Sequence, residues 1–248
     1  MVTSTLLVVF LAALATALCT GLGALPLLAM RDVPKRWMAL STAAAGGLML
    51  AASHALIAEG AGLDAATTML GILAGLGGIL LGQRLVADVP PIPALAAKGI
   101  DPAKALLIVG VMTVHSFAEG VGVGVSFGGT PELATFITTA IAVHNIPEGL
   151  AIALLLVPAG MSVGRAAAWG VFSSLPQPLM AVPAFLAVEA FRPFLPFGLG
   201  LAAGAMIWMV IAELLPDTFK EAEPRDVGIV VTLAFTAMLA FQLLVLKH

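Results

Sequence analysis

Two short segments of the sequence combine a histidine and a carboxylate at a spacing suited to metal binding. His115 precedes Glu119 by four residues, His144 precedes Glu148 by four residues, and a glycine follows each glutamate. On a helix, positions i and i+4 lie on one face, so each helix would present one imidazole and one carboxylate from a single stripe. Two such helices facing each other offer two nitrogen and two oxygen ligands, a set that suits Zn²⁺ and other borderline divalent ions.

The composition places these two segments in a membrane. The chain has 248 residues, of which 60% are hydrophobic and only 10% are charged, whereas about 25% of a soluble domain is charged. A water-soluble fold and a disordered chain are therefore excluded, and a net charge of −3 argues against a nucleic-acid partner. We expect an all-α polytopic membrane protein rather than a β-barrel, because the apolar runs are long and do not alternate.

Clusters of turn-forming and charged residues divide the chain into eight predicted transmembrane helices within a single transporter domain, residues 1–248. Their approximate bounds are 5–30, 37–59, 65–86, 104–127, 133–158, 165–190, 196–218 and 227–246.

The basic residues predict the orientation of these helices. Of the 11 Lys and Arg residues, nine fall in the first, third, fifth and seventh connections. The nine are Arg31, Lys35, Arg36, Arg84, Lys98, Lys104, Arg165, Lys220 and Arg225, against Arg192 and Lys247 on the other side. The positive-inside rule then predicts cytoplasmic odd-numbered connections and both termini outside, in the inner or plasma membrane of the cell.

Energetics favour a bound cation at the two His/Glu segments. His115 and His144 each lie about 12 residues into their helices, near the membrane midplane. A carboxylate at that depth costs about 2.5–3.5 kcal/mol, and no Lys or Arg lies in the middle of a predicted helix. Protons, cavity water or a cation must therefore compensate the charge. A single buried His or Glu could be a protonated packing residue, but two matched pairs at equal depth favour a site.

The two segments resemble the signature motifs of the ZIP (Zrt/Irt-like) family of divalent-metal transporters. In that family the fourth span commonly reads His-Asn-x-Pro-Glu-Gly and the fifth reads His-(Asn/Asp)-x-Pro-Glu-Gly. The residues from His144 to Gly149 match fully, and the earlier segment keeps His115, Glu119 and Gly120. The resemblance implies eight transmembrane helices in a 3+2+3 arrangement, with helices 1–3 and 6–8 as inverted repeats around helices 4 and 5.

The resemblance also implies a set of site residues. The primary site would comprise His115, Glu119, His144 and Glu148, with Met49 close by. A second, adjacent site would share the two glutamates and use Ser116, Asn145 and Gln177. Because Gln177 stands where the family commonly has a glutamate, one negative charge is missing, and we expect one strong site and at most a weak second one.

Three further polar residues are candidates for a metal pathway. His54 and Glu59 lie toward the outer end of the second predicted helix and could line the way in. Glu213, in the seventh, lies toward the cytoplasmic side and could form an exit site.

Together these features predict a secondary transporter, and no enzyme, that moves Zn²⁺ into the cytoplasm by alternating access. Fe²⁺, Mn²⁺ and Cd²⁺ remain alternative cargoes, and no prosthetic group is expected. The partners are the metal ion and the lipid bilayer, with a homodimer left open. Two other interpretations stay open: a proton-coupled transporter of an organic solute, with His and Glu as the proton relay, and an intramembrane metalloenzyme, although the chain lacks a His-Glu-x-x-His motif.

Overall fold

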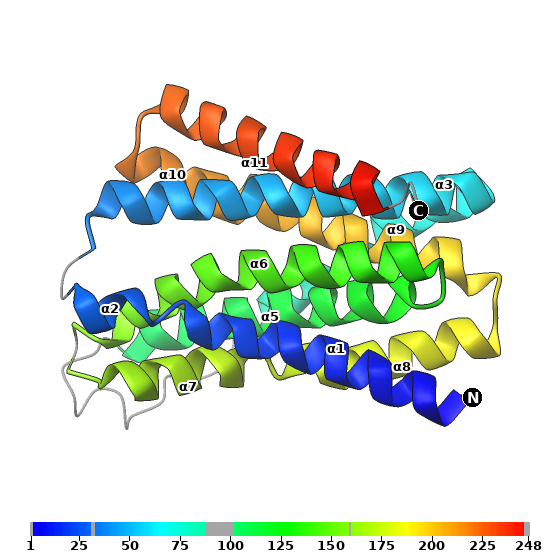
Figure 1. The fold of residues 1–248 in the computed structure, drawn as a ribbon, viewed down its shortest axis with the longest axis horizontal. Helices are drawn as coiled ribbons and strands as arrows, with labels where there is room; N and C mark the ends of the chain where they lie inside the picture. Colours follow the sequence, from blue (N-terminus) through cyan, green and yellow to red (C-terminus); the bar gives the residue numbers. More distant parts are fainter. Residues whose placement is uncertain (1, 31–32, 88–101, 159, 246–248) are drawn as a thin grey trace.

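The computed structural model describes residues 2–30, 33–87, 102–158 and 160–245, and all regular structure within these residues is helical. The helices lie roughly side by side along the long axis of the molecule (Figure 1). Six stretches of the described residues are long and apolar enough to cross a membrane. They are Thr5–Ala29, Lys35–Leu85, Pro131–Leu156, Val163–Ala190, Phe194–Glu221 and Pro224–Leu244. The predicted all-α class is therefore confirmed.

The helix bounds agree with the predicted segments to within a few residues. The elements are α1 (Val2–Leu22), α2 (Pro26–Ala29), α3 (Lys35–Ala87), α5 (Pro102–Ser126), α6 (Pro131–Leu156), α7 (Val163–Ser174), α8 (Pro176–Ala190), α9 (Phe194–Met209), the π-helical turn η1 (Val210–Leu214), α10 (Leu215–Glu221) and α11 (Pro224–Val245).

Helix α3 consists of two arms that meet at Asp64. This residue has non-helical dihedral angles (φ −156°, ψ 106°), and its carboxylate accepts a hydrogen bond from the backbone N–H of Thr67 at 2.6 Å, capping the second arm. A Cβ built on Gly60 would lie 2.8 Å from the Thr68 hydroxyl, so the chain turns back on itself here. The two arms correspond to the second and third predicted helices.

Proline residues account for two further irregularities. The sixth predicted helix is divided into α7 and α8 immediately before Pro176, which places Gln177 in the first turn of α8. Near the end of the seventh, Leu215 donates its N–H to the carbonyl of Val210, five residues back. Pro216 has no N–H to offer the preceding turn, which favours this wider π turn. Glu213 lies within it.

The helices pack mainly as two groups (Figure 1). In the first group, α5 and α6 pack with α1, α7 and α8; in the second, α3 packs with α9, α10 and α11. Small residues permit close packing of α3 against α9, since a Cβ on Gly71 or Gly75 would lie about 2.2 Å or less from a backbone oxygen of α9. The groups meet where α3 packs on α6 and α5, and α5 on α9.

The start of α1 and the end of α11 lie at one end of the bundle, and the start of α3 and the turn between α10 and α11 lie at the other (Figure 1). Two exposed ion pairs join the start of α3 to the α10–α11 region, Lys35 to Glu221 at 3.0 Å and Arg36 to Asp226 at 2.6 Å. The proline-rich part of the third connection, residues 88–101, lies outside the described residues.

Candidate metal centre

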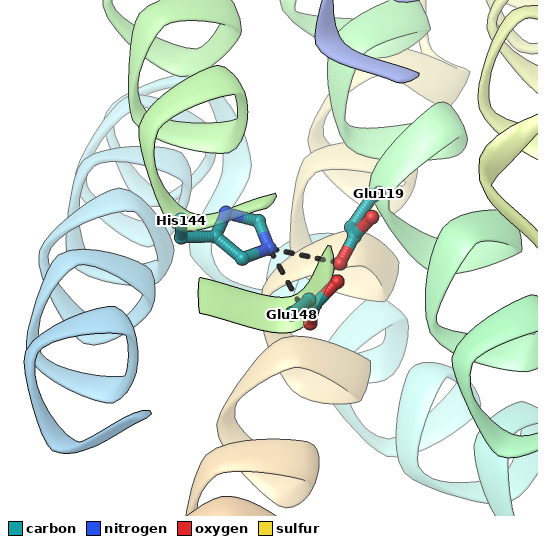
Figure 2. Close-up of side chains that lie close together, drawn as sticks. All are labelled: Glu119, His144 and Glu148. Carbon is teal, nitrogen blue, oxygen red and sulfur yellow. Dashed lines mark hydrogen bonds and ion pairs between the residues drawn. The ribbon is translucent and has the colours of Figure 1, made fainter. Parts of the chain in front are cut away.

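A cluster of three buried side chains lies between α5 and α6 (Figure 2). One ligand atom each of Glu119, His144 and Glu148 lies within 4.8 Å of the others. The Nε2 atom of His144 is 2.9 Å from Oε1 of Glu119 and 3.7 Å from Oε1 of Glu148. The i, i+4 spacing thus places a histidine and a glutamate of α6 on one face, toward the glutamate of α5.

His115, the fourth residue of the predicted set, lies beside this cluster and faces two carboxylates. Its Nδ1 is 3.8 Å from Oε1 of Glu148, and its Nε2 is hydrogen-bonded to Glu213 of η1. Glu213 also accepts a hydrogen bond from Gln83 of α3. His115 therefore links the cluster in the first helix group to polar residues of the second group.

Within the described residues, no Lys or Arg side chain compensates the charges of the cluster. In the described part of the chain, the ion pairs of Glu119 and Glu148 are all with histidines. Glu148 Oε1 and His115 Nδ1 are buried and have no hydrogen-bond partner among the residues that the structure describes. Two buried carboxylates that have no permanently charged partner are unfavourable, whereas a divalent cation between these oxygens and nitrogens would satisfy both their charge and their lone pairs.

A second layer of hydrogen bonds surrounds Glu119. Gln177 of α8 donates from Nε2 to Oε2 of Glu119. The Oε1 atom of Gln177 lies 3.1 Å from Nδ2 of Asn145, which donates to it, and 2.6 Å from the hydroxyl of Thr16. Asn145 also donates to the backbone carbonyl of Thr16 at 2.8 Å. Asn145 and Gln177 therefore bond to each other and to α1.

The glycine after each glutamate allows neighbouring backbones to reach this layer. A Cβ on Gly120 would lie 2.5 Å from the carbonyl oxygen of Gln177, and one on Gly149 would lie 1.7 Å from the carbonyl oxygen of Thr20. Real Cβ atoms do not approach other heavy atoms that closely. The two glycines are thus required for α8 and α1 to pack against the helices that carry the ligands.

Comparison with known proteins identifies the family. A family model described as the ZIP zinc transporter matches residues 95–243, which include the cluster. The chain belongs to the ZIP family.

Three relatives show how widely this similarity extends. A candidate zinc transporter of Arabidopsis thaliana is 47% identical over 234 residues, covering 93% of this chain; the chain spans only 38% of the plant protein. Zinc transporter GufA of Myxococcus xanthus is 32% identical over 87% of this chain and 90% of its own length. Zinc transporter ZIPB of Bordetella bronchiseptica is 34% identical over 89% of this chain and 75% of its own length.

The family and the apolar helices together establish an integral membrane protein of a transporter family. ZIP proteins are transporters rather than enzymes, as the names of the relatives state. The metalloenzyme interpretation is therefore set aside.

Ser116 and Met49, which the ZIP resemblance also implied, are both buried. Ser116 is buried next to His115 in the sequence. Met49 of α3 is fully buried in the apolar core, where its backbone carbonyl accepts a hydrogen bond from Ser53.

The two residues proposed for the way in contact α11 and the turn between α5 and α6. His54 is exposed and packs edge-on against Phe235 of α11, with ring centroids 6.4 Å apart. A Cβ on Gly129, in the turn between α5 and α6, would lie 3.8 Å from Oε1 of Glu59. Glu59 is therefore close to the end of the bundle that also holds the start of α1 (Figure 1).

Sequence reasoning missed Thr16 and Gln83. Both lie in long apolar helices, without a neighbouring His or carboxylate at helical spacing. The spacing of residues along the chain therefore does not single out Thr16 or Gln83. Their hydrogen bonds depend on which helices pack together.

Proposed function

We propose that the chain is a secondary transporter that carries Zn²⁺ or a similar divalent transition metal into the cytoplasm by alternating access at the buried His/Glu cluster. The observation that carries this proposal is the buried group of Glu119, His144 and Glu148, which has no Lys or Arg partner among the described residues. Such a group is costly in a membrane unless a cation occupies it.

The ligand chemistry favours zinc over hard cations. His144 Nε2, Glu119 Oε1 and Glu148 Oε1 supply one nitrogen and two oxygens, and His115 is close enough to become the fourth ligand after a small shift. Mixed imidazole and carboxylate ligands suit Zn²⁺, whereas Mg²⁺ and Ca²⁺ prefer oxygen alone. Fe²⁺, Mn²⁺ and Cd²⁺ use related ligands and remain within the proposal.

We propose eight membrane crossings in the 3+2+3 arrangement. An α-helix crosses a bilayer core of about 30 Å with about 20 residues, so the two arms of α3 would each form one crossing. An even number of crossings is consistent with the start of α1 and the end of α11 lying at one end (Figure 1). The opposite end carries Lys35, Arg36 and Arg225, which supports a cytoplasmic assignment for it and both termini outside.

The two helix groups supply the moving parts of the proposed cycle. The cluster belongs to the first group, whereas Glu213 and Gln83 belong to the second. Sliding of one group against the other would expose the cluster to each side in turn. Because His115 contacts both Glu148 and Glu213, it would pass the ion from the cluster toward the cytoplasmic side, and Glu59 would lie on the outer path.

The membrane potential contributes to the work of transport. A divalent cation moving inward gains about 4.6 kcal/mol per 100 mV. This energy is available without nucleotide hydrolysis, and the sequence has no Gly-x-x-x-x-Gly-Lys-Ser/Thr motif. A metal gradient or coupled protons would add to it.

Uptake of zinc into liposomes containing the purified chain tests the proposal. We expect saturable uptake by the wild type and a loss of at least about 10-fold in His144→Ala and Glu148→Gln, since each removes a ligand. Glu189→Gln is the matched control, because it changes a carboxylate to an amide in an exposed ion pair with Arg192; its uptake should equal that of the wild type. Absence of uptake by inserted wild type, or full uptake by Glu148→Gln, would refute the proposal.

A further inference from the structure

We propose that Asn145 and Gln177 are positioning residues that fix Glu119 from behind and limit the metal centre to a single ion. This inference rests on the proposed metal binding at Glu119, His144 and Glu148 and adds how many ions the centre holds. It follows from the direction of each hydrogen bond in the second layer.

The chain of hydrogen bonds has a fixed direction because it starts at a backbone carbonyl. The carbonyl oxygen of Thr16 can only accept, so the side-chain atom of Asn145 that lies 2.8 Å from it must be the NH₂ group. The same NH₂ group lies 3.1 Å from one side-chain atom of Gln177, which must then be the oxygen. The NH₂ group of Gln177 therefore faces Glu119.

The hydroxyl of Thr16 is consistent with this direction. Its oxygen lies 2.6 Å from Oε1 of Gln177 and 2.7 Å from the carbonyl oxygen of Ala13, so its single proton is shared between two acceptors. All four polar side chains involved are buried. In such surroundings a reversed amide would place two acceptors or two donors against each other, which is costly.

The two oxygens of Glu119 consequently have different roles. Oε2 receives the N–H of Gln177, and Oε1 faces His144 at 2.9 Å. Only Oε1 is directed at the cluster and available to a metal ion there. A second ion bound to Oε2 would have to displace the NH₂ group of Gln177, which occupies that position as a neutral donor.

The surroundings of Oε2 offer little to a second ion. Asn145 Oδ1 is buried and has no hydrogen-bond partner, but it is a neutral amide oxygen. The carboxamide of Gln177 directs its own oxygen away, toward Asn145 and Thr16. A second divalent ion would therefore gain no further anionic ligand beyond Glu119 and Glu148, whose charge the first ion already neutralises.

A carboxylate at position 177 should allow the centre to bind a second metal ion. In Gln177→Glu, one carboxylate oxygen would still accept from Asn145 and Thr16, and the other would face Oε2 of Glu119. Two carboxylate oxygens cannot remain at hydrogen-bond distance without a proton or a cation between them. The variant thus creates a place for a second ion.

Zinc stoichiometry tests the inference directly. Purified protein in detergent is dialysed against buffered Zn²⁺, and bound zinc is measured per chain by elemental analysis. We expect about one zinc per chain in the wild type and about two in Gln177→Glu. Gln177→Met, which keeps the length but neither donates nor accepts through nitrogen or oxygen, should bind about one zinc with roughly 10-fold weaker affinity, because Glu119 loses a charge-assisted hydrogen bond.

The outcomes distinguish this inference from the proposed function. About one zinc in both the wild type and a folded Gln177→Glu would overturn the inference while leaving the transporter proposal intact, and so would two zinc ions in the wild type. Unchanged zinc affinity in Gln177→Met would also overturn it, which keeps the test decisive if Gln177→Glu does not fold. A folded wild type that binds no zinc would instead refute the metal-binding function itself.

Discussion

Gly149→Ala is expected to weaken zinc binding although the residue provides no ligand. The added methyl group would lie 1.7 Å from the carbonyl oxygen of Thr20, whereas ordinary contact begins at 3.4 Å. Helix α1 must therefore move away from α6 by roughly 1.7 Å at this position. Overpacking of this kind costs typically 1–3 kcal/mol in a well-packed interior.

The same displacement reaches the second layer one helical turn away. Asn145 donates to the carbonyl of Thr16 at 2.8 Å, and a rigid shift of α1 by roughly 1.7 Å would stretch this distance to as much as about 4.5 Å, beyond hydrogen-bonding range. Asn145 would then lose the acceptor that fixes its amide, and Gln177, which accepts from Asn145, would no longer be held toward Glu119. We expect zinc affinity to fall by roughly 10-fold, the equivalent of one hydrogen bond to a charged group.

Competition with a zinc-binding dye measures the affinity, and thermal unfolding in detergent measures the stability. Gly77→Ala is the matched control, because its Cβ meets nothing within 4 Å. In the control, zinc affinity should be unchanged and stability should rise by about 0.5–1 kcal/mol, since alanine favours the helix. If folded Gly149→Ala binds zinc as tightly as the wild type, the close approach of α1 does not position the ligands and the reasoning is wrong.

Two further predictions concern polar contacts outside the cluster. In Glu213→Gln, loss of the carboxylate that faces His115 should slow zinc uptake into liposomes by about 10-fold with zinc affinity unchanged; an equal loss of affinity would show that Glu213 is a primary ligand. In Asp64→Ala, loss of the cap on the N–H of Thr67 should lower the melting temperature in detergent. Asp64→Asn retains a side-chain oxygen and should melt near the melting temperature of the wild type. An equal fall in the melting temperature of both variants would show that Asp64 does not stabilise the helix by capping it.

The helical class and the proximity of the four proposed ligands could be predicted from the sequence because both depend on local patterns. Apolar runs of bilayer length locate helices regardless of how they pack. A His and a Glu four residues apart share a face on any helix. Accordingly, His115 and Glu119 of α5 and His144 and Glu148 of α6 come together as expected. The breaks at Asp64 and before Pro176 also fall where turn-forming residues stood.

The second layer could not be predicted because it depends on which helices are neighbours. Thr16 and Gln177 are 161 residues apart, and Gln83 and Glu213 are 130 apart. A threonine or glutamine in an apolar helix has no distinguishing spacing of its own. Glu213 was predicted only as an exit residue, since the π turn that directs it toward His115 changes the helical phase. A search along one helix cannot detect such a change.

The glycine that ends each motif connects the ligand residues to the second layer of hydrogen bonds. Adjacent helical residues point about 100° apart, so when a glutamate faces the cluster, the next residue faces a neighbouring helix. At Gly120 that neighbour is the backbone of Gln177, and at Gly149 it is the backbone of Thr20. Each motif therefore encodes a ligand pair and, in its last residue, the close approach that brings α8 and α1 to the back of the same site. Any larger residue there would retain the four ligand side chains but remove what holds Glu119 in its orientation.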